Sequence, residues 1–474
     1  MPGTSSDHPA TSPGEPPAAP GQPTPTPGQP TGPAPGSPVP RRIRITNVYA
    51  TPWHTADGGS GGDLPDYLRL RHYEQYYRLS AGQLPHVLIR EALDVSALRF
   101  RRWQQHAALV TGARLWLFCL PSGQIVAALS LDVHCEMADT IDLLQDCYAG
   151  DVRIGEATAG QYARTVAAQL GADTAAGQGF LPEHHQIVFD EEPAPEDSDE
   201  LVQRLIYRAD LAYRKEHSAI RYPGELNRRP WWLAAVGPYV SVMCGHEDFI
   251  ENAVFLSAVQ AVAAAAQLRA IRHAAYADVQ QFRDLEAAGG TTRDRRRTLE
   301  RIADQLGNLE LELSYSVEAS ADLGLLVPSL RAESFHHELY ESMSLAGKAV
   351  TAGRMLARLG SAIRAELTAI ESIERRADDN RRVRYAVAVG FVSAVAIPAS
   401  LVLAFLGINA SQVSPARSMF SHHYLGVYLT VAALIVLGAV ISLALYVQQR
   451  RDARHHTAGG QRSRWTLAPD DPRS

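Results

Sequence analysis

The sequence is short of cysteine, and this limits the classes of protein to which the chain can belong. Only four cysteines occur among 474 residues, and no two are spaced as C-x-x-C. They are Cys119, Cys135, Cys147 and Cys244. Such isolated residues predict buried thiols in a reducing compartment and do not indicate a disulfide framework.

Other signals are also absent. The net charge of −6 provides no electrostatic footprint for nucleic acid, so no nucleic-acid partner is expected. No nucleophile elbow, phosphate loop or dinucleotide fingerprint occurs, and we expect that the protein is not an enzyme and needs no cofactor. The N-terminus is polar and proline-rich without an apolar core, so no secretory signal is predicted and the N-terminal part is expected to be cytosolic.

Charge is missing from two long apolar runs near the C-terminus. Tyr385–Ile408 and Tyr424–Val447 each contain 24 residues and no charged side chain. About 20 residues suffice for a helix to cross the hydrocarbon core, so the runs predict a two-span transmembrane hairpin in a lipid bilayer. Pro398 is compatible with a membrane helix when neighbouring groups satisfy the freed carbonyl. The alternative is a pair of buried core helices.

Arginines flank the two runs, and they predict the orientation of the hairpin. The arginines before the first run and after the second are Arg375, Arg376, Arg381, Arg382, Arg384, Arg450, Arg451 and Arg454. The loop between the runs, 409–423, holds one arginine and no lysine. Because positive residues stay on the cytoplasmic side, we expect a multi-pass plasma-membrane protein with both termini in the cytoplasm.

Composition divides the chain into five expected parts. Residues 1–40 hold 14 of the 29 prolines, a composition that cannot bury enough apolar surface to fold. The parts are a disordered tail (1–41), a cytosolic α/β domain (42–245), a long-helix stalk (246–380), the transmembrane hairpin (381–448) and a basic cytosolic tail (449–474).

The α/β domain is predicted from alternating strand-like and helix-like patterns. Strands are expected at 42–50, 114–120, 124–133, 185–190 and 239–244. Pro121-Ser122-Gly123 predicts a hairpin turn between the second and third of these strands. Helices are expected at Glu136–Tyr148 and Ala157–Leu170, and the acidic stretch 191–200 is expected to be a solvated loop.

The stalk is predicted as a series of long helices. Glu247–Ala288 reads as one helix, and its alanine-rich middle is expected to be buried because polar residues such as Gln260 and Arg269 interrupt it. Gly289-Gly290 ends it, and Thr291 or Thr292 can cap a second helix to about Asp322. A third helical stretch starts near Ala332 and can continue into the first apolar run. Gly347, Gly353 and Gly360 are positions at which it could instead bend or be interrupted.

The first run closes on Gly407-Ile408-Asn409. This motif, at the outer end of the first of two terminal spans behind a cytosolic α/β domain and long helices, resembles the CorA family of magnesium transporters. The family signature is usually Gly-Met-Asn, and the isoleucine resembles looser members, including zinc-transporting relatives. The resemblance covers nearly the whole chain beyond the tail and implies a CorA-like fold.

The resemblance also implies how the chain assembles and what it carries. Family members are homopentamers in which the first span lines a central ion channel. Five copies of Asn409 would then ring the outer mouth, with Ser400, Ile397 and Val389 lining the pore below it. The substrate would be Mg²⁺, with Zn²⁺, Co²⁺ or Ni²⁺ as alternatives, and a divalent cation would also be a possible regulator.

The chemistry of the motif suits a hydrated cation. Magnesium gives up its water reluctantly, and the carbonyl oxygens of an asparagine ring can accept hydrogen bonds from coordinated water. Gly407 removes a side chain where the backbone must turn, and we expect unwinding there. Two plainer interpretations stand beside this one. Asn409 can be a helix C-cap, and the spacing of Ser393, Ser400 and Gly407 can serve helix packing.

Other features leave alternatives open. The outer loop 409–423 contains no acidic residue, whereas loops of the family often do, so a non-transporting membrane-anchored sensor or scaffold is the second hypothesis. A membrane-tethered enzyme is a third, resting on unplaced histidine pairs. His336-His337-Glu338 with Glu341 resembles a metal-binding helix, but a solvated stalk face is expected. No regulatory metal site can be assigned among the acidic residues of the stalk, which are Asp304, Glu310, Glu312, Glu318 and Asp322.

Overall fold

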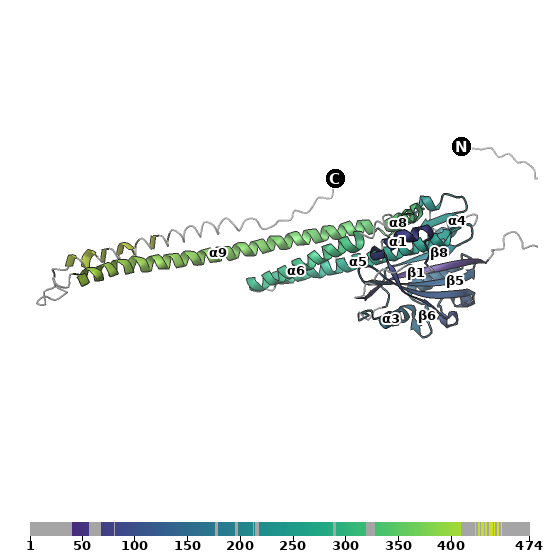
Figure 1. Cartoon of the computed structure of the whole chain (residues 1–474), viewed down its shortest axis with the longest axis horizontal. Helices are drawn as coiled ribbons and strands as arrows, with labels where there is room; N and C mark the ends of the chain where they lie inside the picture. The colour runs from purple at the N-terminus through teal and green to yellow at the C-terminus, as the bar shows by residue number, and fades with distance from the viewer. Residues whose placement is uncertain are drawn as a thin grey trace, which may run out of the picture. The chain divides into compact units, whose positions relative to one another are not determined.

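The computed structural model describes residues 40–55, 68–79, 81–175, 179–194, 198–211, 213, 218–287, 291–318 and 328–408, with separate positions between 422 and 447. These residues form two compact units (Figure 1). The first, here called the sheet unit, comprises the residues up to Ala266 together with Ser320–Ala346. The second, here called the helical unit, comprises Gln267–Ala319 and the residues from Gly347 onward.

The sheet unit is built on a seven-stranded sheet with strand order β2-β4-β5-β1-β8-β10-β9. Its strands are β1 (Arg41–His54), β2 (His86–Ala92), β4 (Val110–Cys119), β5 (Gln124–Cys135), β8 (His184–Asp190), β9 (Leu233–Val236) and β10 (Val240–Cys244). Neighbouring strands are antiparallel except for β8 and β10, which are parallel. The mixed α/β prediction is confirmed, and the five predicted strands are all present.

The turn between β4 and β5 illustrates how local sequence builds this sheet. Gly123 adopts φ +80°, and a Cβ added there would lie 2.7 Å from the Thr55 carbonyl oxygen. Glycine therefore avoids both the left-handed strain and the clash. The register that follows pairs Cys119 with Ile125 and Leu115 with Leu129, so the predicted hairpin is confirmed.

Helices cover both faces of the large sheet. One face packs against α2 (Thr140–Ala149), α3 (Ala159–Gln169) and α4 (Ser198–Tyr207). On the other face, the Phe255 ring of α5 (Asp248–Ala287) meets Trp116 and Phe118 edge-on, with ring centroids 5.6 and 5.1 Å away. Smaller elements complete the unit: α1 (Glu74–Leu79), α8 (Leu330–Ser342) and a three-stranded sheet of β3 (Leu98–Arg99), β6 (Arg153–Ile154) and β7 (Ala157–Thr158).

Sequence patterning missed β2, β9 and the small sheet. β9 has four residues and each strand of the small sheet has two, which is too short for a period of two to emerge. The acidic stretch 191–200 is also not wholly a loop, because α4 begins at Ser198. The four cysteines are buried and free, as predicted.

The helical unit contains the part of α5 from Gln267 onward, α6 (Thr292–Glu312), a π-helical turn at Leu313–Glu318 and most of α9 (Leu345–Ile408). Thr291 caps α6 by accepting a hydrogen bond from the Asp294 N–H, as the sequence predicts. The α6 helix ends at Glu312, ten residues before the expected end, because a π-helical turn follows it.

A break separates α8 from α9, so the third helical stretch does not run unbroken from Ala332. Ser344 adopts φ +55° between the two helices, a conformation that a right-handed helix cannot include. α9 then continues for 64 residues through Pro398, about 96 Å at 1.5 Å per residue. Residues 1–39 of the Pro/Gly-rich tail and the whole basic tail lie outside the described residues, and β1 begins at Arg41, one residue inside the predicted tail.

Candidate functional site

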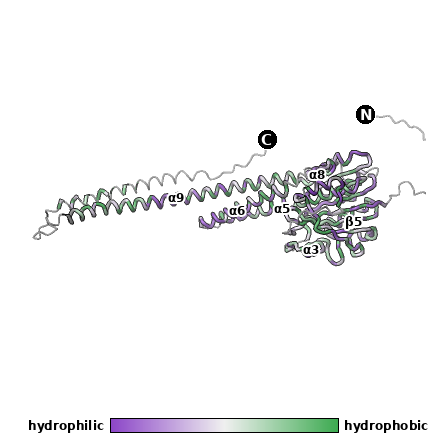
Figure 2. Tube along the Cα trace, in the orientation of Figure 1, coloured by the Kyte–Doolittle hydropathy of each residue, from purple (hydrophilic) through white to green (hydrophobic). Residues whose placement is uncertain are grey.

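The predicted site lies in the C-terminal half of α9, where an arginine cluster is followed by a charge-free stretch. Arg375, Arg376, Arg381, Arg382 and Arg384 are all exposed to solvent. From Tyr385 to Ile408 no residue is charged. Figure 2 shows the change along α9 from a hydrophilic section to a mostly hydrophobic end. The helix therefore changes character abruptly at Arg384 and Tyr385.

Large apolar side chains in this stretch are exposed around the helix. They include Tyr385, Val389, Phe391, Val392, Ile397 and Leu401. At about 100° per residue their directions spread over the whole circumference and do not form one stripe. A helix that is apolar all round is stable only in an apolar surrounding, either a protein core or a membrane. The sheet and helical units supply no such surrounding at these described positions.

The α5 helix provides the contrast. Among the described residues, one helix is long and apolar enough to cross a membrane by length and composition, Asp248–Leu285 in α5. Its apolar window is 94% buried inside the protein, as expected for a core helix. Several side chains of Tyr385–Ile408 lie outside the described ones, but most of the described ones are exposed. At these positions the end of α9 is uncovered, whereas the apolar window of α5 is covered by protein.

The predicted pore-lining residues lie on one face of α9. Val389 and Ile397 are 64% and 58% exposed, and the Ser400 hydroxyl donates to the Ile397 carbonyl oxygen at 2.8 Å. Because α9 is continuous, Val389, Ile397 and Ser400 fall within a sector of about 80°. Gly407 follows Val389 by 18 residues, or about five turns, and so points along the same line.

The selectivity motif is described only in part. Gly407 and Ile408 are the last two residues of α9, and the expected unwinding near Gly407 does not occur up to Ile408. Asn409 lies outside the described residues, as do most of the outer loop and part of the second run. The described positions of the second run, including Leu429, Val436 and Leu443, are helical and exposed.

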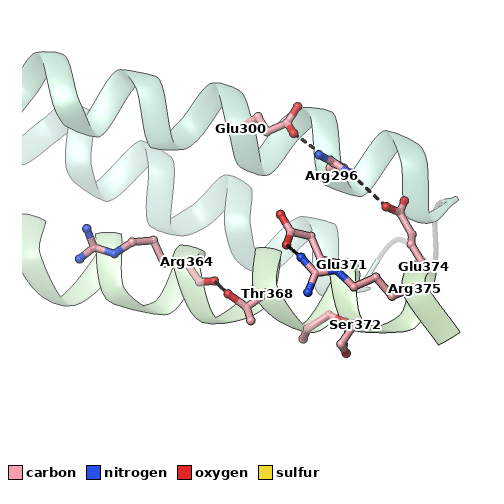
Figure 3. A network of polar contacts seen from close by, with 9 residues as sticks. Arg296, Glu300, Arg364, Thr368, Glu371, Ser372, Glu374 and Arg375 are labelled. Atoms are coloured by element: carbon pink, nitrogen blue, oxygen red, sulfur yellow. Dashed lines mark hydrogen bonds and ion pairs between the residues drawn. The ribbon is translucent and has the colours of Figure 1, made fainter.

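Within the helical unit, α6 runs antiparallel to α9, and the two helices are joined by ion pairs. Figure 3 shows Arg296 of α6 between two carboxylates: its Nε donates to Glu300 at 2.8 Å and its Nη1 to Glu374 of α9 at 3.0 Å. Arg295 pairs with Glu366 at 2.7 Å. Leucine and isoleucine side chains of both helices, including Leu306 and Ile363, are buried in the unit. This packing positions the part of α9 that precedes the arginine cluster.

The histidine motif on α8 does not form a solvated face. His336 is buried, and its Nδ1 lies 2.6 Å from the Ser257 Oγ of α5. His337 is exposed, and the carboxylate of Glu338 instead pairs with Arg221 at 3.4 Å. The expectation of a solvated face was wrong for His336, because α8 folds back onto the sheet unit and one of its faces becomes core.

Buried polar groups elsewhere in the sheet unit hold no recognisable metal centre. No group of three or more histidine, cysteine or acidic side chains within the described ranges could hold a metal ion. His185 is fully buried, which lowers its pKa to about 3, and its Nε2 lies 2.8 Å from the Ser241 hydroxyl. The stalk acids Asp304, Glu310 and Glu312 are exposed, as solvated residues would be.

One partly buried ion-pair network, in which only Glu251 is buried, joins α5 to the sheet. The Arg44 guanidinium of β1 contacts Asp132 of β5 at 2.8 Å and Glu251 of α5 at 2.5 Å. Burial raises the pKa of Glu251 to about 7, and the charge of Arg44 opposes that rise. Arg114 contacts the other oxygen of Asp132 at 2.7 Å. No sequence pattern indicated this network, because its members are separated by up to 207 residues.

Comparison with known proteins adds no assignment. No family model matches the chain, and neither a curated protein nor a solved structure matches it.

Proposed function

We propose that the chain is a divalent-cation transporter or channel of the CorA type, with Mg²⁺ as the first candidate substrate and Zn²⁺, Co²⁺ and Ni²⁺ as alternatives. Five copies assemble around a central axis in the plasma membrane, with both termini in the cytoplasm. The first span of each copy lines the pore, and Asn409 of each copy joins a ring at the outer mouth. A ring of neutral amides binds hydrated cations weakly enough to release them, as conduction requires.

The exposed, charge-free end of α9 is the single observation that supports this proposal most strongly. Its apolar side chains need an apolar surrounding that the described units do not provide. The arginines before Tyr385 favour a cytoplasmic position for that end of the span. Ser400, Val389 and Gly407 share a face of a continuous helix, which is compatible with a pore lining repeated in each copy.

The membrane potential, negative inside, favours cation entry by about 2.3 kcal/mol per charge per 100 mV. Exposed Val389 and Ile397 suit an apolar constriction that closes the pore when water leaves it. Neither step requires a protein ligand that strips water from the ion.

Ion flux into vesicles tests the proposal. Purified protein is reconstituted, and the uptake of Mg²⁺, Zn²⁺, Co²⁺ and Ni²⁺ is measured with and without a pH gradient. Asn409→Ala is expected to abolish the flux while the oligomer stays intact in size-exclusion chromatography. Asn380→Ala is the matched control, because Asn380 is an exposed α9 residue before the span and its loss should leave flux unchanged. Normal flux through Asn409→Ala would refute the role of the amide ring.

A non-transporting membrane-anchored sensor or scaffold is the second candidate. It is favoured by the outer loop, which contains no acidic residue to concentrate cations. The loop instead carries Arg417, His422 and His423. If unaltered protein in vesicles carries none of the four cations although it is folded and oligomeric, this second function replaces the first.

A further inference from the structure

The Arg208 guanidinium lies among three aromatic rings on the sheet unit. Its Cζ atom is 4.0 Å from the centroid of the Tyr148 ring and 5.8 Å from that of Tyr239. The His184 ring stacks on Tyr239 at 5.3 Å with an interplanar angle of 12°. These residues come from the end of α4, from α2, from the start of β8 and from the residue before β10. The fold therefore brings together four segments that are distant in sequence.

Hydrogen bonds fix one side of the guanidinium. The Arg208 Nη1 donates to the Gln186 Oε1 at 3.0 Å and lies 3.3 Å from the His184 Nε2. The His184 Nδ1 lies 2.8 Å from the Pro182 carbonyl oxygen, to which only a protonated nitrogen can donate. The Nε2 of neutral His184 is then an acceptor for Arg208. Burial lowers the pKa of His184, which favours this neutral form.

The other side of the guanidinium has no hydrogen-bond partner among the residues that the structure describes. Arg208 contacts no carboxylate in the described part of the chain, and burial lowers the pKa of its guanidinium. The Nε and Nη2 atoms make no hydrogen bond to these residues. A side-chain nitrogen that is both buried and without a hydrogen bond is found at the Arg204 Nε, but not in Arg208. The Nε and Nη2 of Arg208 therefore reach solvent.

Arg208 follows the last residue of α4, and its φ of +51° lies in the left-handed region that commonly ends a helix. The Arg208 and Ala209 N–H groups donate to the Leu205 and Arg204 carbonyl oxygens at 3.1 and 2.9 Å, so the end of the helix fixes the backbone from which the side chain extends. The rings beside it also leave its charge uncompensated, because a cation–π contact attracts the guanidinium without neutralising it. Tyr148 and Tyr239 are each about half exposed, so the rings border an open position.

We propose that Arg208 forms a binding site for a small oxyanion, a carboxylate or a phosphate group. The anion takes the Nε and Nη2 donors as a bidentate pair, the geometry in which a guanidinium fork binds two oxygens. Tyr148 and Tyr239 border the bound group, while Gln186 and His184 hold Nη1 and keep the fork oriented. The site belongs to the sheet unit and does not depend on whether the chain transports cations.

Arginine-selective modification tests the site on the unaltered full-length protein. Purified protein is treated with phenylglyoxal in sodium chloride, sodium phosphate or sodium acetate at equal ionic strength, and modification of each arginine is measured by peptide mass spectrometry. At a ligand concentration ten times the dissociation constant, mass action slows the modification of Arg208 about tenfold. Arg42, an exposed arginine of the same unit, is the internal control and is expected to react at one rate in all three salts.

The salts also distinguish the two sources of the oxyanion. Protection by phosphate alone assigns a phosphate group, and protection by both salts assigns any small oxyanion that fits the fork. Equal rates at Arg208 in all three salts would overturn the proposal, and so would equal protection of Arg208 and Arg42. Because no substitution is needed, the result does not depend on a variant that folds.

A substitution provides a second measurement. Arg208→Lys keeps the charge but removes the bidentate fork, and phosphate is expected to raise the melting temperature of the unaltered protein more than that of this variant. Arg42→Lys is the matched control and should keep the full phosphate response. A full response in Arg208→Lys would contradict bidentate binding.

Discussion

The Ser257 hydroxyl of α5 and the His336 ring of α8 are joined by a hydrogen bond of 2.6 Å inside the sheet unit. The two residues are 79 positions apart, and both are buried. The contact attaches α8 to the part of α5 that covers the sheet. It also uses the polar groups of both residues, which would otherwise be costly in an apolar core.

Ser257→Ala is expected to destabilise the protein by about 1 kcal/mol, because it removes a buried hydrogen bond to the His336 ring. Chemical denaturation of the full chain in detergent, followed by tryptophan fluorescence, measures the change. His337→Ala on the exposed side of α8 is the control and should change stability by no more than about 0.5 kcal/mol. Equal stability of Ser257→Ala and the unaltered protein would mean that the hydrogen bond contributes nothing.

Thiol labelling is expected to show where the bilayer begins on α9. A cysteine at Ala377, on the exposed section before the span, should react with a water-soluble maleimide in vesicles, whereas one at Val392 should not. The native cysteines add little background, because they are buried and burial raises the pKa of the Cys147 thiol to about 12. Detergent-denatured protein, in which both sites should react, provides the control. Equal labelling of the two positions in intact vesicles would exclude a membrane-buried α9 end.

The antiparallel contact of α6 with α9 is expected to contribute little through each ion pair. Arg295 and Glu366 are each about one-third exposed, and surface pairs typically contribute 0.2–1 kcal/mol. A double-mutant cycle with Arg295→Gln and Glu366→Gln should give a coupling of about 0.5 kcal/mol that falls in high salt. The same cycle on Arg42 and Glu366, which lie in different units, is expected to give no coupling. A coupling above about 2 kcal/mol would contradict this account.

Acid is expected to destabilise the sheet unit through its buried histidines. Burial lowers the pKa of His185 to about 3 and that of His246 to about 4, so both are neutral in the folded protein near pH 5. In the unfolded chain their pKa is near 6.5, so the unfolded state binds more protons below that pH. The stabilising contribution is therefore present above pH 6.5 and is lost as the pH falls towards 4 and then 3.

For each of these two histidines, the free energy of unfolding is expected to be about 2 kcal/mol lower at pH 5 than at pH 7. Denaturant midpoints measured at half-unit pH steps give this slope. His185→Gln should have a shallower slope, while His337→Gln, a change at an exposed position, should keep the original one. An identical slope in His185→Gln would show that His185 is not the titrating group.

Much of the sheet unit could be predicted from sequence because its signals are local. The alternation around 42–50 and the Pro121-Ser122-Gly123 turn predict β1 and the β4–β5 hairpin without any knowledge of distant contacts. The cap at Thr291 is equally local. The sequence indicated Gly347 as a place where the third helical stretch could be interrupted, whereas the break lies three residues earlier, at Ser344.

The candidate site was predicted only at the level of a segment. Absence of charge from Tyr385 to Ile408 identified the stretch, and the Gly407-Ile408-Asn409 motif provided the hypothesis about its chemistry. The burial of His336 and the ring cage around Arg208 were not predicted. Neither has a spacing in the sequence that would distinguish it from a surface residue.

Sequence alone determined where the chain lacks charge, where it turns and which short stretches are strands, because these properties depend on residues a few positions apart. It did not determine which of two apolar helices is covered by protein. In the described residues the apolar window of α5 is buried inside the protein, whereas the end of α9 presents most of its side chains outward. That difference comes from contacts between residues distant along the chain, and only the folded arrangement specifies which partners meet.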